Sequence, residues 1–178
     1  MTFNVFLTGL LAATAAALPQ GNYARSGESG AVEARDSGSG GIQIVNNLGT
    51  DVYLWTTSSD PGSMKTLSAG SDYSEDWTTN SNGGGISIKM STTQSKDSVL
   101  QFEYTQDDDK FFWDMSSIDL DETSEFIKGG FTAKPSDSSC RSASCAAGDA
   151  NCAESYQHPD DVNTYSCSKD SSFTLTLG

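Results

Sequence analysis

The sequence predicts an all-β fold, and two observations lead to this prediction. Short runs that are β-branched, aromatic or alternately apolar and polar recur along the chain, and clusters of Gly, Asn, Ser and Asp separate them. Many short strands joined by turn residues are typical of a β-sandwich or barrel. Beyond the apolar run at the start of the chain, no ten-residue stretch repeats its apolar residues at the helical period of about 3.6 residues.

Five runs are strand candidates. Residues 42–46 and 52–55 are rich in β-branched and aromatic side chains, and Ile and Met alternate with small or polar residues in 85–90. Residues 99–104 combine apolar and aromatic side chains, and in 173–177 Phe and Leu alternate with Thr. Alternation with a period of two indicates a strand with one face buried. The aromatic residues are expected mostly to fill the core, although one or two could be exposed and form a sugar-stacking platform, and the candidates are Trp55, Trp77, Trp113, Tyr53, Tyr73, Phe111 and Phe112.

A run of three acidic residues, Asp107–Asp109, lies between the segments around Phe102 and Phe112. This run of three adjacent carboxyl groups is compatible with a cation site or an acidic recognition patch. Charge runs more often mark a solvated surface, so we interpret it as the turn of a hairpin.

The chain divides into three segments by composition. Residues 2–17 are an uncharged apolar run that ends in small residues, which predicts a secretory signal peptide over 1–17. The run is too short and too weakly apolar for a transmembrane anchor. Residues 18–41 are rich in Gly, Ser and Ala and are expected to be a disordered spacer or pro-segment. Residues 42–178 suffice for one domain with one sizeable core.

The formal net charge is −14, and no basic cluster occurs anywhere in the sequence. This excludes nucleic acids and anionic membranes as expected partners, because both require a positive surface. Neutral polymers, cations and basic proteins remain as expected partners. Four cysteines in an exported chain predict two disulfides with three possible pairings. The cysteine spacing matches no zinc pattern, so we expect no metal or cofactor, and we expect a monomer.

The segment between Cys152 and Cys167 contains Tyr156, Pro159 and the pair Asp160-Asp161. It resembles the C-terminal signature of thaumatin-like proteins. Further stretches in the same order are similar to other parts of that family, namely Ile44–Asn47 with Val52-Tyr53, Leu67–Gly70 with Trp77 and Gly85–Lys89, and Leu100–Phe102 with Phe112–Asp119. Residues 42–178 therefore resemble a small fungal thaumatin-like protein of the Blastomyces yeast-phase-specific family.

This resemblance implies a thaumatin-like β-sandwich without the disulfide-rich second domain of larger members. That domain lies between the positions equivalent to Cys145 and Cys152, and only six residues separate these cysteines here. The nested pairing of the family implies the disulfides Cys140–Cys167 and Cys145–Cys152.

The resemblance also implies a ligand cleft. In larger members an Arg, a Glu and three Asp residues line a cleft that in some of them binds or cleaves β-1,3-glucan. The Arg and Glu positions are Lys89 and Gln101 here, and the Asp positions are Asp114, Asp119 and either Asp160 or Asp161. We expect these groups to converge on one electronegative surface, where mutual repulsion raises some carboxyl pKa values.

The carboxamide of Gln101 cannot act as the acid or the base of glycoside hydrolysis. Glu103 lies two residues further along the same strand and faces the same side, so it is either a replacement acid opposite Asp114 or Asp119 or a solvated surface side chain. We therefore expect a secreted, non-catalytic binding protein of the cell wall or cell surface. Its ligand would be β-glucan, another wall polysaccharide or a host surface protein. The alternatives are an endo-β-1,3-glucanase with a reduced carboxylate set and a structural or antigenic wall component.

Overall fold

The computed structural model describes residues 40–178, so the predicted signal peptide and nearly all of the predicted spacer lie outside the described residues. The all-β prediction is confirmed, because strands make up almost all of the regular structure in this range. The strands are β1 (Gly41–Asn46), β2 (Val52–Thr57), β3 (Lys65–Leu67), β4 (Asp72–Asp76), β5 (Ile86–Ser91), β6 (Leu100–Gln106), β7 (Lys110–Ser116), β8 (Phe131–Pro135), β9 (Ala143–Cys145), β10 (Tyr165–Ser168) and β11 (Phe173–Leu177).

One helix of five residues, α1 (Glu125–Gly129), occurs within residues 40–178. Ser124 caps it by accepting a hydrogen bond from the backbone N–H of Ile127 at 3.2 Å, which satisfies one of the free N–H groups at the helix start. No helix in the described part of the chain has the length and apolar character needed to cross a membrane.

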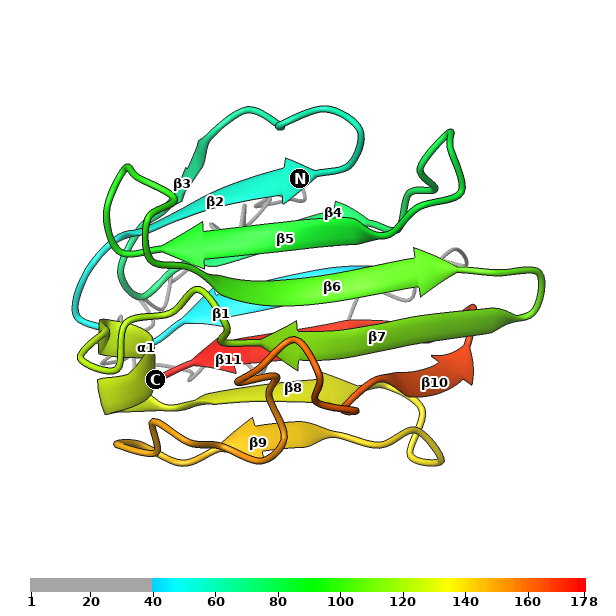
Figure 1. Ribbon diagram of the computed structural model, residues 1–178. Helices are drawn as coiled ribbons and strands as arrows, with labels where there is room; N and C mark the ends of the chain where they lie inside the picture. Colours follow the sequence, from blue (N-terminus) through cyan, green and yellow to red (C-terminus); the bar gives the residue numbers. More distant parts are fainter. Residues whose placement is uncertain (1–39) are drawn as a thin grey trace, which may run out of the picture. The chain divides into compact units, whose positions relative to one another are not determined.

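The strands form two sheets. One has five strands in the order β4-β1-β11-β8-β9, and the other has six in the order β10-β7-β6-β5-β2-β3. Every pair of neighbouring strands is antiparallel except β1 and β11, which pair in parallel from Ile42 opposite Phe173 to Asn46 opposite Leu177. In Figure 1, β5, β6 and β7 of the six-stranded sheet lie in front of β1 and β11 of the other sheet.

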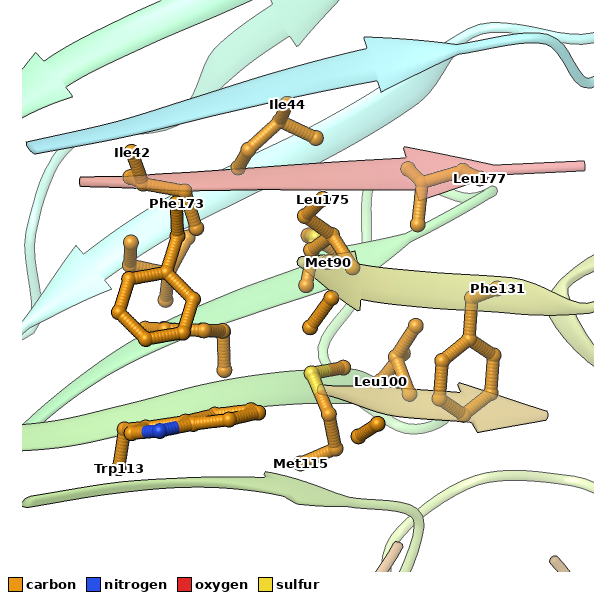
Figure 2. Close-up of a cluster of buried hydrophobic side chains, with 14 of the residues drawn as sticks. Ile42, Ile44, Met90, Leu100, Trp113, Met115, Phe131, Phe173, Leu175 and Leu177 are labelled. Carbon is orange, nitrogen blue, oxygen red and sulfur yellow. The ribbon is translucent and has the colours of Figure 1, made fainter. Parts of the chain in front are cut away.

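A single apolar core fills the space between the sheets. Alternate residues of each strand face inward, so Ile42 and Ile44 of β1 lie on the same side as Leu175 and Leu177 of β11. Figure 2 shows these side chains facing Met90, Leu100, Trp113 and Met115 from the six-stranded sheet. Burial of each large apolar side chain contributes about 1.5–3 kcal/mol.

An aromatic cluster occupies one end of this core. The Trp113 and Phe173 rings meet edge to face with their centroids 4.7 Å apart, and the Trp77 and Phe111 centroids are 4.5 Å apart. Trp77 also donates a hydrogen bond from its indole N–H to the backbone carbonyl of Ser171 at 2.8 Å. Trp77 and Trp113 thus have the core role expected for most of the aromatic residues.

Disulfides Cys140–Cys167 and Cys145–Cys152 are present, with Cα atoms 5.4 and 5.5 Å apart, and these are the pairs that the family resemblance implies. Cys140 follows β8 of the five-stranded sheet, while Cys167 belongs to β10 at the edge of the six-stranded sheet. This bridge therefore joins the two sheets covalently along one side of the sandwich.

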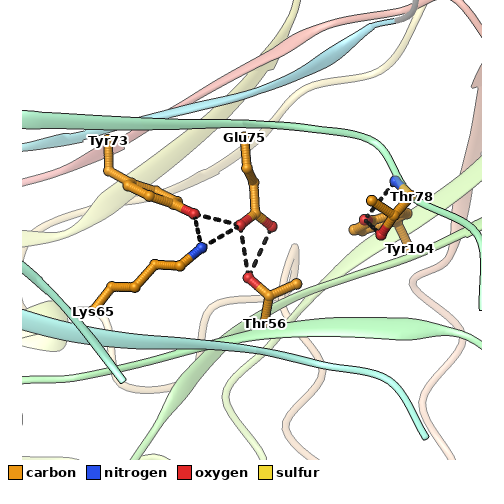
Figure 3. Close-up of polar contacts among 6 residues, drawn as sticks. All are labelled: Thr56, Lys65, Tyr73, Glu75, Thr78 and Tyr104. Atoms are coloured by element: carbon orange, nitrogen blue, oxygen red, sulfur yellow. Dashed lines mark hydrogen bonds and ion pairs between the residues drawn. The ribbon is translucent and has the colours of Figure 1, made fainter. Parts of the chain in front are cut away.

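A polar cluster joins the two sheets along the other side, where β4 lies near β2 and β3 (Figure 3). The Glu75 carboxylate accepts one hydrogen bond from the Thr56 hydroxyl, which lies 2.7 and 2.9 Å from its two oxygens, and another from the Tyr73 hydroxyl at 2.6 Å. The Lys65 ammonium lies 3.5 Å from the same carboxylate and also donates to the Tyr73 hydroxyl. The half-buried charge of Glu75 is thus fully hydrogen-bonded, which a charge removed from water requires.

Candidate functional site

The outer face of the six-stranded sheet carries three of the six predicted cleft residues, Lys89, Gln101 and Asp114. In β5 the side chains of Ile86, Ile88 and Met90 enter the core, so Ser87 and Lys89 between them point to the opposite side. Strand register then places their neighbours. One row across β5, β6 and β7 consists of Lys89, Gln101 and Ser116. A second row consists of Ser87, Glu103 and Asp114. Directly opposed side chains on one face have Cβ atoms about 4.5–5.5 Å apart.

A pocket of about 380 Å³ opens over the second of these rows. Its lining residues come mainly from the ends of β2 and β6 and the first half of β5 and β7. This volume is within the range of about 300–1,000 Å³ that is typical of small-molecule sites. Hydroxyl groups, backbone, two carboxyl groups and aromatic rings form its wall, contributed by Thr57, Ser58, Gly85, Ile86, Ser87, Glu103, Tyr104, Thr105, Phe112, Asp114 and Thr164.

The carboxyl groups of Glu103 and Asp114 form the electrostatic centre of this pocket. Burial raises the pKa of Asp114 from its ordinary value of 3.8 to about 7, and the negative charge of the neighbouring Glu103 contributes to the rise. Asp114 therefore gains and loses its proton near neutral pH. When protonated it can donate a hydrogen bond, and when ionised it can only accept.

Lys89 and Gln101 lie next to the pocket but do not line it. The Gln101 side-chain carbonyl accepts hydrogen bonds from the Lys89 ammonium and, at 3.2 Å, from the Ser87 hydroxyl. Its amide nitrogen donates to the Ser116 hydroxyl at 3.5 Å, and the residue is only 5% exposed. Gln101 is thus bound into a network within the sheet face, and its carboxamide has no ionisable group that could act as an acid or a base.

The remaining predicted cleft residues lie in loops. Asp119 is exposed in the turn that follows β7, where its backbone carbonyl accepts from Val99 at 2.9 Å, and Asp160 is exposed in the loop before β10. The Asp161 carboxylate accepts from the backbone N–H groups of Gln157 and His158 at 2.8 and 2.9 Å. These two hydrogen bonds lower the pKa of Asp161 and hold its own loop in shape. None of the three lines the pocket, and the convergence of all six residues stays a prediction.

Sequence reasoning missed the neutral members of the pocket. Ser87 and Thr105 lie on the same strand faces as Lys89 and Glu103, so the alternation of the strands was a usable signal for them. Thr164 belongs to a loop, where its hydroxyl hydrogen-bonds to the Tyr156 hydroxyl at 2.8 Å, and no sequence pattern indicates its place in the pocket.

Two aromatic rings on this sheet face differ in their accessibility. Phe112 is 37% exposed and lines the pocket, so its ring is open to a ligand. Trp55 is 6% exposed, and the Lys96 ammonium lies over its ring at 5.4 Å from the centroid. Lys96 also donates to the backbone carbonyl of Pro61 at 3.1 Å, so the ring of Trp55 is covered rather than open for stacking.

Residues Asp107–Asp109 form the exposed turn between β6 and β7, as expected. Within residues 40–178, no three His, Cys, Asp or Glu side chains are grouped closely enough to hold a metal ion.

Solved structures with this fold identify the class of protein. The protein elicitor MoHrip2 from Magnaporthe oryzae superposes with a TM-score of 0.64 at 26% identity, over 78% of this chain and 98% of that one. The thaumatin-like xylanase inhibitor TLXI superposes with a TM-score of 0.50 at 12% identity, over 76% of this chain and 97% of that one, which is a likeness of fold alone. The two-sheet sandwich is that of a thaumatin-like protein.

Sequence comparison defines the family more narrowly. The family described as Blastomyces yeast-phase-specific protein matches residues 31–178, and the chain belongs to this family. The secreted thaumatin-like protein calA of Emericella nidulans is 51% identical over 140 residues, which are 79% of this chain and 82% of the relative. The antigenic thaumatin-like protein of Arthroderma benhamiae is 41% identical over 140 residues, which are 78% of this chain and 70% of the relative.

Proposed function

We propose that the protein is an exported, non-catalytic binding protein of the cell wall or cell surface. Its ligand is a neutral polysaccharide, with β-1,3-glucan as the first candidate. The relatives named as secreted and as antigenic support export and a location outside the cell. The observation that carries the proposal is the pocket of about 380 Å³ on the outer face of the six-stranded sheet.

The chemistry of the pocket wall fits a sugar. Thr57, Ser87, Thr105 and Thr164 bring hydroxyl groups that both donate and accept hydrogen bonds, as sugar hydroxyls do. The exposed ring of Phe112 offers an apolar surface to the flat face of a sugar. The formal net charge of −14 disfavours an anionic polymer, so a neutral one is favoured.

The arrangement of the two carboxyl groups argues against hydrolysis. Glycosidases place two carboxyl groups on either side of the scissile bond, one to protonate the leaving oxygen and one to attack or activate water. Glu103 and Asp114 are register partners on one sheet face, so both project from the same side toward a ligand in the pocket. The third candidate, Asp119, lies in a turn outside the pocket.

One observation favours a second candidate function, a weak endo-β-1,3-glucanase. The pKa of Asp114 near 7, beside the carboxyl group of Glu103, provides a proton donor next to a potential base. Both functions can be tested in one tube, by pull-down on insoluble β-1,3-glucan with release of reducing sugar measured from the same sample.

The expected result is retention of the wild-type protein on the glucan without release of sugar. Phe112→Ala should be retained at least tenfold less well, because a buried Phe ring contributes about 1.5 kcal/mol or more. Asp170→Asn changes an exposed residue outside the pocket and should behave as the wild type. Sugar release that Asp114→Asn abolishes would establish the hydrolase instead. Failure of the wild type to bind would refute the glucan proposal and leave a host protein or a structural wall role.

A further inference from the structure

A second pocket, of about 220 Å³, lies beside the first. The loop between β4 and β5 forms one of its walls through Asn80, Gly83 and Gly84, and the end of β6 forms another through Thr105 and Gln106. The two pockets have three lining residues in common, Ile86, Tyr104 and Thr105. The two pockets are therefore neighbours, and they share a wall formed by the start of β5 and the end of β6.

The wall of the second pocket carries hydroxyl and amide groups but no charged side chain. Hydroxyl groups come from Thr78, Thr79 and Thr105, and amide groups from Asn80 and Gln106. This differs from the first pocket, where two carboxyl groups are present. A charged ligand would find no counter-charge in the second pocket, whereas a neutral hydroxyl-bearing ligand would find both donors and acceptors.

Asn80 holds a free acceptor in this wall. Its side-chain oxygen is buried and has no hydrogen-bond partner, although its side-chain nitrogen donates to the backbone carbonyl of Gly85 at 3.4 Å. A buried polar atom without a partner is rare and costs free energy, so it calls for an explanation. This oxygen has almost no accessible surface, so a ligand hydroxyl can donate to it, and supply the missing hydrogen bond, only after the Asn80 side chain turns toward the pocket.

The loop that carries Asn80 is held in place by its own hydrogen bonds. The Gly83 N–H donates to the Asn80 carbonyl at 2.9 Å, and the Gly84 N–H donates to the Asn82 side chain at 2.8 Å. Gly83 has a φ of +75°, and a side chain added there would meet no atom within 4 Å. The loop backbone is thus pre-formed, and a ligand would have to turn only the Asn80 side chain.

We propose that the second pocket is an extension subsite. A linear neutral polysaccharide runs from the Glu103–Asp114 pocket past Thr105 and donates a hydroxyl to Asn80. This inference rests on the proposed function. A volume of about 220 Å³ is small for an independent site, given the usual range of about 300–1,000 Å³, but it suits one part of a longer chain. The ligand is therefore recognised by its length as well as by its chemistry.

Isothermal titration with soluble β-1,3-linked glucose oligomers, from the disaccharide to the longest soluble chain, tests the inference. Wild-type affinity should rise with chain length. Thr79→Trp fills the second pocket from an exposed position and should bind the long oligomers roughly tenfold more weakly, as loss of one or two hydrogen bonds predicts. Its affinity for the short oligomers should not change. Thr123→Trp, also exposed but outside both pockets, is the matched control.

Asn80→Ala removes the free acceptor without adding bulk and should show the same dependence on length. The inference is overturned if both pocket variants bind every oligomer as the control does, or if they lose affinity equally for short and long chains. In either case wild-type binding would leave the proposed function intact. If the wild type binds no oligomer of any length, the proposed function fails and the inference fails with it.

Discussion

Replacing Asp114 by Asn should stabilise the protein at neutral and alkaline pH and change its stability little at acid pH. Asn has the shape of a protonated Asp and cannot ionise. In the folded protein the pKa of Asp114 is about 7, above its ordinary value of 3.8, mainly because the group is buried and then because Glu103 is close. Between these two values the folded protein keeps a proton that the unfolded chain has released. The free energy of unfolding therefore falls as pH rises through this window, and the loss is complete above the folded pKa.

The size of the effect follows from the width of the window, from 3.8 to about 7. Each pH unit changes the free energy of unfolding by about 1.4 kcal/mol, which gives about 4 kcal/mol as an upper value. Asp114 is only partly buried, and access of water reduces the expected stabilisation of Asp114→Asn to about 2 kcal/mol.

Urea unfolding followed by tryptophan fluorescence measures this difference. Wild type and Asp114→Asn should have similar midpoints near pH 4 and should diverge up to about pH 8, with unchanged slopes. Titrating groups far from Asp114 affect both proteins equally, so the difference between the two curves reports Asp114 together with its interaction with Glu103. A difference that is the same at both pH values would refute the argument, because Asp114 would then have an ordinary pKa in the folded protein.

Further predictions concern Glu103, the polar cluster around Glu75 and the two disulfides. In Glu103→Gln the pKa of Asp114, followed by NMR, should fall below about 7 yet stay above 3.8, because burial is the larger cause of the rise; an unchanged value would contradict this. Glu75→Gln should lower the free energy of unfolding by about 1.5–3 kcal/mol, since the charged carboxylate accepts short hydrogen bonds from two hydroxyl groups, and a loss below about 0.5 kcal/mol would show that the cluster adds little. Replacing both cysteines of Cys140–Cys167 by Ser should cost about 3.5 kcal/mol, against about 2.4 kcal/mol for Cys145–Cys152, because the bridges span 27 and 7 residues. Thermal unfolding in the opposite order would argue against loop entropy as the cause.

Most strands with one buried face could be predicted from the sequence, whereas edge strands could not, and the inner strand β8 was missed as well. The predicted runs 42–46, 85–90 and 173–177 agree with β1, β5 and β11 because core packing imposes a period of two on them. Strand β4, Asp-Tyr-Ser-Glu-Asp, is polar throughout, and its place in the sheet depends on pairing with β1. Strand β9 has three residues, too few to show any period.

The candidate site, like the fold, could be predicted from the sequence only in part. Alternation along β6 predicted that Gln101 and Glu103 share a face, and the structure agrees. Which residue of β7 lies opposite each of them depends on hairpin register, and that register places Glu103 beside Asp114. Asp161 matched a family pattern in sequence, but its two backbone hydrogen bonds are a property of loop geometry that no residue pattern reports.

The parallel pairing of β1 with β11 has a consequence for biosynthesis. Strand β11 is the central strand of its sheet, between β1 and β8, so the five-stranded sheet cannot close until the ribosome has made residues 173–177. Until then β1 and β8 each present an unpaired edge, and such edges readily pair with other chains. A chain shortened at this end would lose the middle of the sheet and keep both edges open. Residues 173–177 are therefore required before the five-stranded sheet can form.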